Sequence, residues 1–195
     1  MIRFCDVFFS LLGLIVLSPI FVFIALCIVL DSRGGVFYRQ VRVGRGGKDF
    51  RLFKFRSMAS GADKKGLITV GAKDSRVTRI GYFLRKYKLD ELPQLLNVVR
   101  GEMSLVGPRP EVRKYVDMYT VEQRKVLAVA PGITDYASIE YADENTILGQ
   151  ARDPDRAYVE QIMPDKIRYN MKYIDNRCLK EYFKIIFLTL MKIVK

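Results

Sequence analysis

The sequence predicts an α+β protein in which an N-terminal membrane helix precedes a compact, mostly helical domain with a small β-hairpin and amphipathic interfacial helices. Three observations support this class. Residues 4–30 are almost uninterruptedly apolar, and about 20 such residues suffice to cross a bilayer. Within residues 50–56, apolar and basic residues alternate, as in a strand with one solvent-exposed, basic face. Most of the remaining chain carries apolar residues at helical spacing.

Composition narrows the chemistry. The 195 residues include 33 Lys and Arg but only 21 Asp and Glu, which gives a net charge of +12. A basic chain favours an anionic partner, such as nucleic acid, anionic lipid or a phosphorylated substrate. The absence of histidine excludes histidine acid–base chemistry and His-ligated metals, but not an oxygen-bound cation such as Mg²⁺. Cys5, Cys27 and Cys178 lack metal-ligand spacing and are interpreted as unpaired packing residues.

The apolar run is broken near its middle by Ser18-Pro19. Pro19 removes a helical hydrogen bond and bends the helix, and the Ser18 hydroxyl can satisfy a freed carbonyl. Arg3 precedes the run, and further basic residues follow it between 33 and 48. Because positive charge stays cytoplasmic, this pattern suits a re-entrant helix that returns to its side of origin. A simple kinked anchor explains the charges equally well.

After the membrane element, the patterns predict the following order. Residues 36–38 pair with 50–56 as a hairpin, 59–74 form a polar loop, and 135–165 are acidic and irregular. Helices are expected over 75–87, from about Asp90, and over 111–129, 165–175 and 179–194. The last of these is basic and amphipathic, which suits a lipid headgroup region or packing against its own domain.

The stretch around Asp90-Glu91 carries the most chemical information. Pro93 is tolerated in the first turn of a helix, so a helix should begin near Asp90. Its expected buried stripe comprises Leu92, Leu95, Leu96 and Val99. Two carboxylates would then lie at a helix N-terminus, which also favours a bound anion. Alone, the pattern is explained as well by Asp90 as an N-cap and Glu91 as a first-turn acid.

Arg109 lies between two prolines, at 108 and 110. Both stiffen the backbone beside it. A rigidly held guanidinium is suited to bidentate binding of phosphate. An incidental arginine in a tight turn is the alternative.

Taken together, several segments form a recognisable series. They are Ser18-Pro19, Lys-Phe-Arg-Ser-Met at 54–58, Arg-Val-Thr-Arg-Ile-Gly at 76–81, Leu-Asp-Glu-Leu-Pro-Gln-Leu-Leu-Asn-Val at 89–98, Gly-Glu-Met-Ser-Leu-Val-Gly-Pro-Arg-Pro-Glu at 101–111 and Pro-Gly-Ile-Thr at 131–134. Over nearly the whole chain this series resembles the bacterial sugar transferases, the small monotopic phosphoglycosyl transferases.

The resemblance implies a topology and a reaction. Residues 1–32 would form a re-entrant membrane helix, and 33–195 a catalytic domain at the cytoplasmic face of the bacterial inner membrane. The enzyme would move a sugar-1-phosphate from a UDP-sugar to polyprenyl (undecaprenyl) phosphate, release UMP and use Mg²⁺, as the first membrane step of a surface glycan pathway. The expected partners are these substrates and membrane lipid, without nucleic acid; a homodimer is left open.

The resemblance also implies residue roles. Asp90 would be the nucleophile that forms an acyl-phosphate intermediate and would bind Mg²⁺, while Glu91 would orient the site or assist proton and charge handling. The basic residues expected to bind substrate phosphate are Lys54, Arg56, Arg85 and Arg109.

The sequence departs from the family pattern after Thr134. Asp135 stands where relatives often have Gly, residues 139–143 replace a region with a Gly-Arg pair, and Glu181 stands for a family Asp near the C-terminal helix. These changes leave the sugar and its contacts open. Two other readings also stay open: a membrane-anchored basic binding module without catalysis, and a glycosyltransferase that releases UDP instead of UMP.

Overall fold

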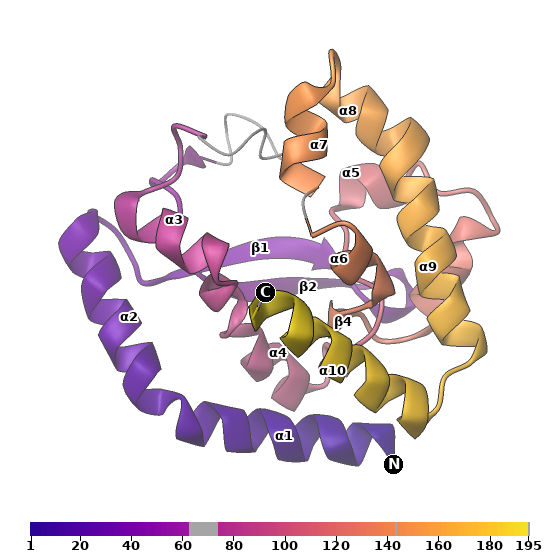
Figure 1. Cartoon of the computed structure of the whole chain (residues 1–195), viewed down its shortest axis with the longest axis horizontal. Coiled ribbons are helices and arrows are strands. Elements are labelled where there is room, and N and C mark those ends of the chain that lie inside the picture. The colour runs from indigo at the N-terminus through magenta and orange to yellow at the C-terminus, as the bar shows by residue number, and fades with distance from the viewer. Residues whose placement is uncertain (63–73, 143, 195) are drawn as a thin grey trace.

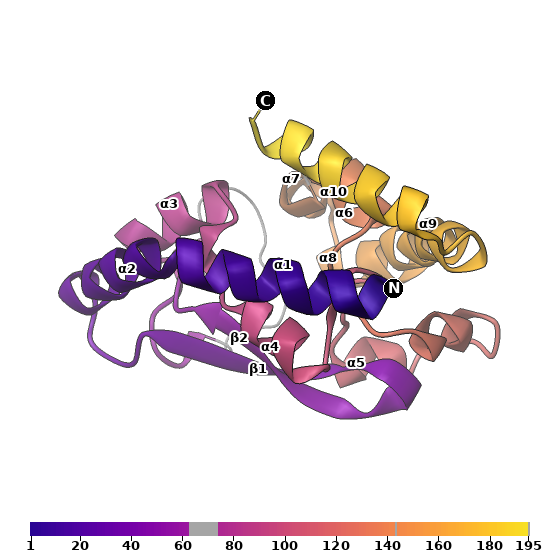
Figure 2. The same cartoon turned by 90° about the horizontal axis from the view of Figure 1, so that it is seen from below.

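The computed structural model describes residues 1–62, 74–142 and 144–194, and shows helices arranged around two small sheets (Figure 1). The mixed helix-and-sheet class expected from the sequence is therefore confirmed. Figure 2 shows helices α3 (Arg79–Lys86) and α10 (Leu179–Val194) on one side of the molecule and the hairpin of β1 (Phe37–Val43) and β2 (Asp49–Phe55) on the other. Helix α4 (Gln94–Arg100) lies between α1 (Ile2–Val16) and that hairpin.

The apolar run forms two helices, α1 and α2 (Ser18–Asp31), which meet at 61°. The Ser18 hydroxyl donates to the Ile15 carbonyl at 2.8 Å, which is the carbonyl that Pro19 has no N–H to satisfy. The expected break and the role of Ser18 are confirmed. Among the described residues, no single helix is long and apolar enough to span a bilayer, whereas the bent pair together meets that requirement.

The hairpin is confirmed and is longer than expected. Strands β1 and β2 pair antiparallel from Phe37 opposite Phe55 to Val43 opposite Asp49. The turn between them contains Gly46 and Gly47, whose φ values of 68° and 76° favour glycine. Arg39 and Arg100 both lie over the Phe53 ring, at 4.9 and 4.8 Å from its centroid.

The expected helix over 75–87 is shorter, since α3 begins after Thr78, whose side chain caps it by accepting from the Gly81 amide. A Cβ on Gly81 would lie 2.0 Å from the Ser57 carbonyl oxygen, so this glycine permits the close approach of α3 to the segment after β2. Most of the polar loop expected at 59–74 lies outside the described residues.

The helix expected from Asp90 was placed too early. Leu89–Glu91 form a 3₁₀ turn, and α4 begins only at Gln94, after Pro93. A helix continuing through residue 93 would bring the proline ring against the carbonyl four residues earlier. The expected buried stripe of Leu92, Leu95, Leu96 and Val99 is only half-buried. The fully buried face carries Gln94, Asn97 and Val98 instead, because α4 is held between β2 and α1.

A second, parallel sheet was not anticipated. It pairs β3 (Ser104–Val106) with β4 (Gly132–Thr134). The two chains approach so closely that a Cβ on Gly132 would lie 2.1 Å from the Gly107 amide nitrogen. Glycines are thus required where this sheet leads into the Pro-Arg-Pro segment.

The single helix expected over 111–129 was wrong. The chain forms α5 (Arg113–Val116) and a separate 3₁₀ helix at Gln123–Ala128. Thr120 and Gln123 exchange side-chain bonds with each other's amides, at 3.2 and 2.9 Å. This reciprocal capping box starts a new helix and explains the interruption.

The irregular segment expected at 135–165 was also wrong. It contains α6 (Tyr136–Glu140), α7 (Glu144–Gln150), α8 (Pro154–Ala157) and a π-helical turn at Tyr158–Ile162. Asp135 and Asp153 cap α6 and α8, so these acids mark helix starts. The last two expected helices are confirmed as α9 (Met163–Asp175) and α10.

Candidate active site

The site is built on the turn between α3 and α4. Lys88 has a left-handed backbone, with φ of 56°, and is the only such non-glycine residue among those described. This conformation is uncommon outside glycine and recurs at functional sites. It reverses the chain just before Asp90, whose side chain is only 5% exposed.

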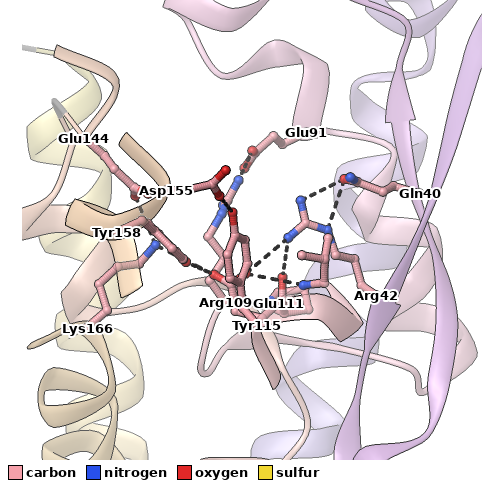
Figure 3. Close-up of polar contacts among 12 residues, drawn as sticks. Gln40, Arg42, Glu91, Arg109, Glu111, Tyr115, Glu144, Asp155, Tyr158 and Lys166 are labelled. Atoms are coloured by element: carbon pink, nitrogen blue, oxygen red, sulfur yellow. Dashed lines mark hydrogen bonds and ion pairs between the residues drawn. The ribbon is translucent and has the colours of Figure 1, made fainter. Parts of the chain in front are cut away.

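Glu91 lies between two cations. Lys54 Nζ is 2.9 Å from Glu91 Oε1. Arg109 donates from both terminal nitrogens to the two carboxylate oxygens of Glu91, one of them at 3.1 Å (Figure 3). The side chain of Glu91 is 12% exposed and that of Arg109 is 31% exposed. The bidentate pairing joins the Asp90-Glu91 turn to the Pro-Arg-Pro segment.

The two adjacent acids are tuned in opposite directions. Burial raises the pKa of Asp90, with Glu91 adding to the shift, although the charges of Lys54, Arg85 and Lys88 act against it. Burial would also raise the pKa of Glu91, but Arg109 and Lys54 outweigh it and hold the pKa well below its usual range. The ionised form of Glu91 is therefore favoured, whereas burial makes the ionisation of Asp90 costly.

The backbone of Arg109 is fixed by Asp135. Asp135 is fully buried, and its Oδ2 accepts from the Arg109 amide at 3.1 Å while its Oδ1 accepts from the Ser138 amide at 2.6 Å. Asp135 therefore ties Arg109 to the start of α6. The charge of Glu91 is the main cause of the raised pKa of Arg109, and the carboxylate of Asp135 adds to it.

A polar network surrounds the other side of the Pro-Arg-Pro segment (Figure 3). Glu111 accepts from the Tyr158 hydroxyl, and its carboxylate lies 3.8 Å from Arg42 and 4.0 Å from Lys166. Arg42 also donates to the Pro110 carbonyl at 3.0 Å. The network links the hairpin with α9, so Arg109 is supported from both sides.

The structure separates the four basic residues expected to bind phosphate. Lys54 and Arg109 meet at Glu91, and Arg85 is close enough to Asp90 to favour its ionised form. Arg56 lies elsewhere: its buried guanidinium donates to carbonyls at the end of α2, namely those of Arg33, Ser32 (2.7 Å) and Ile28 (3.3 Å). It therefore stabilises a helix terminus.

The described residues do not form a complete Mg²⁺ site by themselves. Among the described residues, no three Asp, Glu, Cys or His side chains converge as a metal site, and both Glu91 oxygens are engaged by cations. Asp90, the acid next to Glu91, forms no ion pair with another described residue. Mg²⁺ commonly uses one or two carboxylates plus phosphate oxygens, so Asp90 with a bound diphosphate fits this cation.

Sequence patterns did not indicate three supporting residues. Asp135 was noted only as a departure, and Glu111 only as part of a motif. Asn97 was placed in a helix without a role, yet its side chain accepts from the Phe53 amide at 2.9 Å and donates to the Arg51 carbonyl at 2.8 Å. A polar residue within an apolar helical pattern was the available signal for Asn97.

Comparison with known proteins identifies the family of this chain. A family model described as bacterial sugar transferase matches residues 1–195. The chain is 36% identical over 195 residues to the UDP-N-acetylgalactosamine-undecaprenyl-phosphate N-acetylgalactosaminephosphotransferase of Aeromonas hydrophila, covering 98% of this chain and 43% of that protein. It is 39% identical over 193 residues to the UDP-glucose:undecaprenyl-phosphate glucose-1-phosphate transferase of Klebsiella pneumoniae, covering 97% and 39%.

A shorter match comes from Bacillus subtilis (strain 168). Its putative undecaprenyl-phosphate N-acetylgalactosaminyl 1-phosphate transferase is 44% identical over 120 residues, which cover 62% of this chain and 67% of that protein. The present chain thus spans only about two fifths of the Aeromonas and Klebsiella proteins, at 43% and 39% of their lengths. Since the family model nevertheless matches every residue, this chain belongs to the bacterial sugar transferase family.

Proposed function

We propose that this chain transfers a sugar-1-phosphate from a UDP-sugar to undecaprenyl phosphate and releases UMP. The observation that carries the proposal is the different environment of the two adjacent acids. Glu91 is locked between Lys54 and Arg109, while adjacent Asp90 is buried and its pKa is raised. A carboxylate is a competent nucleophile towards phosphorus, and the named relatives act on undecaprenyl phosphate.

In the proposed reaction, an Asp90 oxygen attacks the phosphorus that bears the sugar. The bond from that phosphorus to the bridging oxygen breaks, and UMP leaves with the electron pair. A phosphate oxygen of undecaprenyl phosphate then attacks the aspartyl-phosphosugar, which forms the lipid diphosphate sugar and restores the Asp90 carboxylate. Bound Mg²⁺ would neutralise charge on the diphosphate.

The protein's own residues would supply the remaining stabilisation. Phosphoryl transfer needs positioning and charge neutralisation more than covalent assistance. Arg109 is part-exposed beside Glu91, and Arg85 and Lys54 act on the charge of Asp90. We assign these three to the substrate phosphates and leave Arg56 at the end of α2.

We also propose that the protein is monotopic and lies on the cytoplasmic face of the bacterial inner membrane. The bent α1–α2 pair supports this topology, with its break at Ser18-Pro19. So do exposed apolar side chains of α3 and α10, two helices that lie on the same side of the molecule (Figure 2). The exposed residues are Tyr82 and Phe83 of α3, Tyr87 at its C-cap, and Phe183, Phe187, Leu190 and Met191 of α10. Such surfaces suit a lipid headgroup region.

The test is a comparison of the wild type with Asp90→Asn. Both are incubated with undecaprenyl phosphate and either UDP-glucose or UDP-N-acetylgalactosamine, and UMP and UDP are separated by chromatography. We expect UMP from the wild type with at least one donor, and none from the variant, because the amide cannot act as the nucleophile. Without the lipid acceptor, intact-mass spectrometry of the wild type should show a sugar-phosphate adduct.

Other results have clear meanings. Release of UDP instead of UMP would indicate a glycosyltransferase. Membrane binding with neither product would indicate a basic binding module. Full turnover by folded Asp90→Asn would remove the nucleophile assignment.

A further inference from the structure

The first turns of α1 carry a charged side chain that a membrane helix should avoid. Asp6 is the only charged residue at 4–30, and it is 2% exposed. A buried carboxylate is unfavourable unless donors satisfy it. Three donors do so here, all directed at Oδ1: the Ser104 hydroxyl and the Leu105 amide at 2.9 Å, and the Tyr182 hydroxyl at 2.8 Å.

One turn earlier, Arg3 holds a different element. Its two terminal nitrogens donate to the carbonyls of Val98 and Val99, at 2.6 and 3.0 Å. These carbonyls belong to the last turn of α4, where a cation also complements the helix dipole. Further along, a Cβ on Gly13 would lie 3.2 Å from Leu95 Cδ1, so α1 packs closely along α4.

The two held elements carry the two halves of the candidate site. The turn with Asp90 and Glu91 lies just before the N-terminus of helix α4. Contacts that hold the C-terminal end of α4 therefore also restrict the position of that turn. Strand β3 leads within three residues to Arg109, which binds Glu91. Arg3 and Asp6, three positions apart in α1, therefore contact α4 and β3 respectively. These are the two elements next to the segments that the Glu91–Arg109 pair joins.

We propose that Arg3 and Asp6 are positioning residues that set the alignment of the Asp90-Glu91 turn with Arg109. The membrane helix is then a structural part of the active site as well as an anchor. This inference rests on the proposed function for its activity readout. The competing view gives Arg3 only the task of keeping the N-terminus cytoplasmic by its charge.

Arg3→Lys separates the two views. Lysine keeps the positive charge, but it cannot make the two forked bonds to Val98 and Val99. We expect unchanged membrane recovery, a KM for the UDP-sugar close to that of wild type and kcat reduced about tenfold, since small misplacements of reacting groups are costly. Arg45→Lys, at an exposed position in the hairpin turn, is the matched control and should keep wild-type kcat.

Hydrogen–deuterium exchange of the full chain in detergent gives a readout independent of turnover. In Arg3→Lys, we expect faster amide exchange over residues 94–101, and in Asp6→Leu over 104–109, because each loses the contacts that hold that segment. Arg45→Lys should change neither. If Asp6→Leu does not fold, Arg3→Lys alone still carries the test.

The outcomes discriminate between the two proposals. Wild-type kcat and unchanged exchange in Arg3→Lys would overturn the positioning role. So would a kcat loss that disappears when the assay is run well below the unfolding temperature, since that would reflect stability alone. If the wild type releases no UMP but both exchange changes occur, the proposed function fails while the positioning role stands.

Discussion

The clusters around Glu91 and Asp6 both enclose a carboxylate, but they do so with different chemistry. Glu91 is surrounded by the cations Lys54 and Arg109, whereas Asp6 is surrounded by hydroxyl and amide donors from β3 and α10. The Glu91 cluster includes the part-exposed Arg109, whereas Asp6 is buried. The Glu91 cluster depends on ionic pairing with cations that can also interact with substrate phosphates. The Asp6 cluster depends only on an acceptor oxygen in the right place.

The largest expected effect comes from making the same carboxylate-to-amide change in both clusters. Glu91→Gln leaves Lys54 and Arg109 without their anion, and we expect a stability loss of about 3–5 kcal/mol together with loss of UMP release. Asp6→Asn keeps an oxygen in place of Oδ1, and we expect a loss of only about 1–2 kcal/mol with most of the turnover retained.

Thermal or denaturant unfolding in detergent, alongside the UMP assay, measures both variants. The comparison fails if Asp6→Asn is at least as damaging as Glu91→Gln, because Asp6 would then matter through its charge.

Replacing Arg109 by lysine tests the geometry of the Glu91 cluster with its charge unchanged. Lysine cannot pair with both carboxylate oxygens, and we expect UMP release to fall by about 10²-fold, as it does when an aligned electrostatic contact is lost. Arg113→Lys is the control. Its partner Asp49 is exposed, so that surface pair contributes about 0–1 kcal/mol and turnover should not change. Equal activity of the two variants would rule out a bidentate requirement at Arg109.

The pH dependence gives the smallest but most specific effect. Burial raises the pKa of Asp90. As pH falls, nucleophilic attack by Asp90 should therefore begin to weaken at a higher pH than it would for an ordinary aspartate. Lys54 favours the ionised form of Asp90. We therefore expect Lys54→Met to move the acid limb of single-turnover UMP release to still higher pH.

Glu91 should affect stability over a lower pH range, because its pKa is shifted in the opposite direction to that of Asp90. Because its pKa is depressed, its ion pairs stabilise the protein above the pKa of the unfolded chain, and this contribution is lost as pH falls through the folded value. Unfolding measured over the same pH range as turnover separates the two acids. An acid limb that Lys54→Met leaves in place would show that Asp90 does not control it.

Local patterns predicted those elements whose signals lie within a few residues. The break at Ser18-Pro19 follows from proline geometry, and the hairpin follows from alternation between glycine turns. The capping box at Thr120 and Gln123 was also present in the sequence, and reading it would have corrected the long helix expected over 111–129.

The candidate site was predicted in part. The motif around Asp90 and the rigid Arg109 identified the right segments, and the structure brings Lys54, Glu91 and Arg109 together. Arg56 was expected to bind substrate phosphate together with them. Alternation of a strand places residues i and i+2 on one face, but side-chain reach carries the Arg56 guanidinium to the end of α2.

The sequence by itself determined the bent apolar helix, the basic character, the absence of histidine chemistry and the family motifs. All of these depend on residue type or on neighbours along the chain. Only the tertiary structure decided that Asp135 fixes Arg109, that Arg3 and Asp6 reach α4 and β3, and that Asp90 and Glu91 differ in pKa. Burial and charge pairing depend on segments up to 176 residues apart, such as Asp6 and Tyr182, and no local pattern records those contacts.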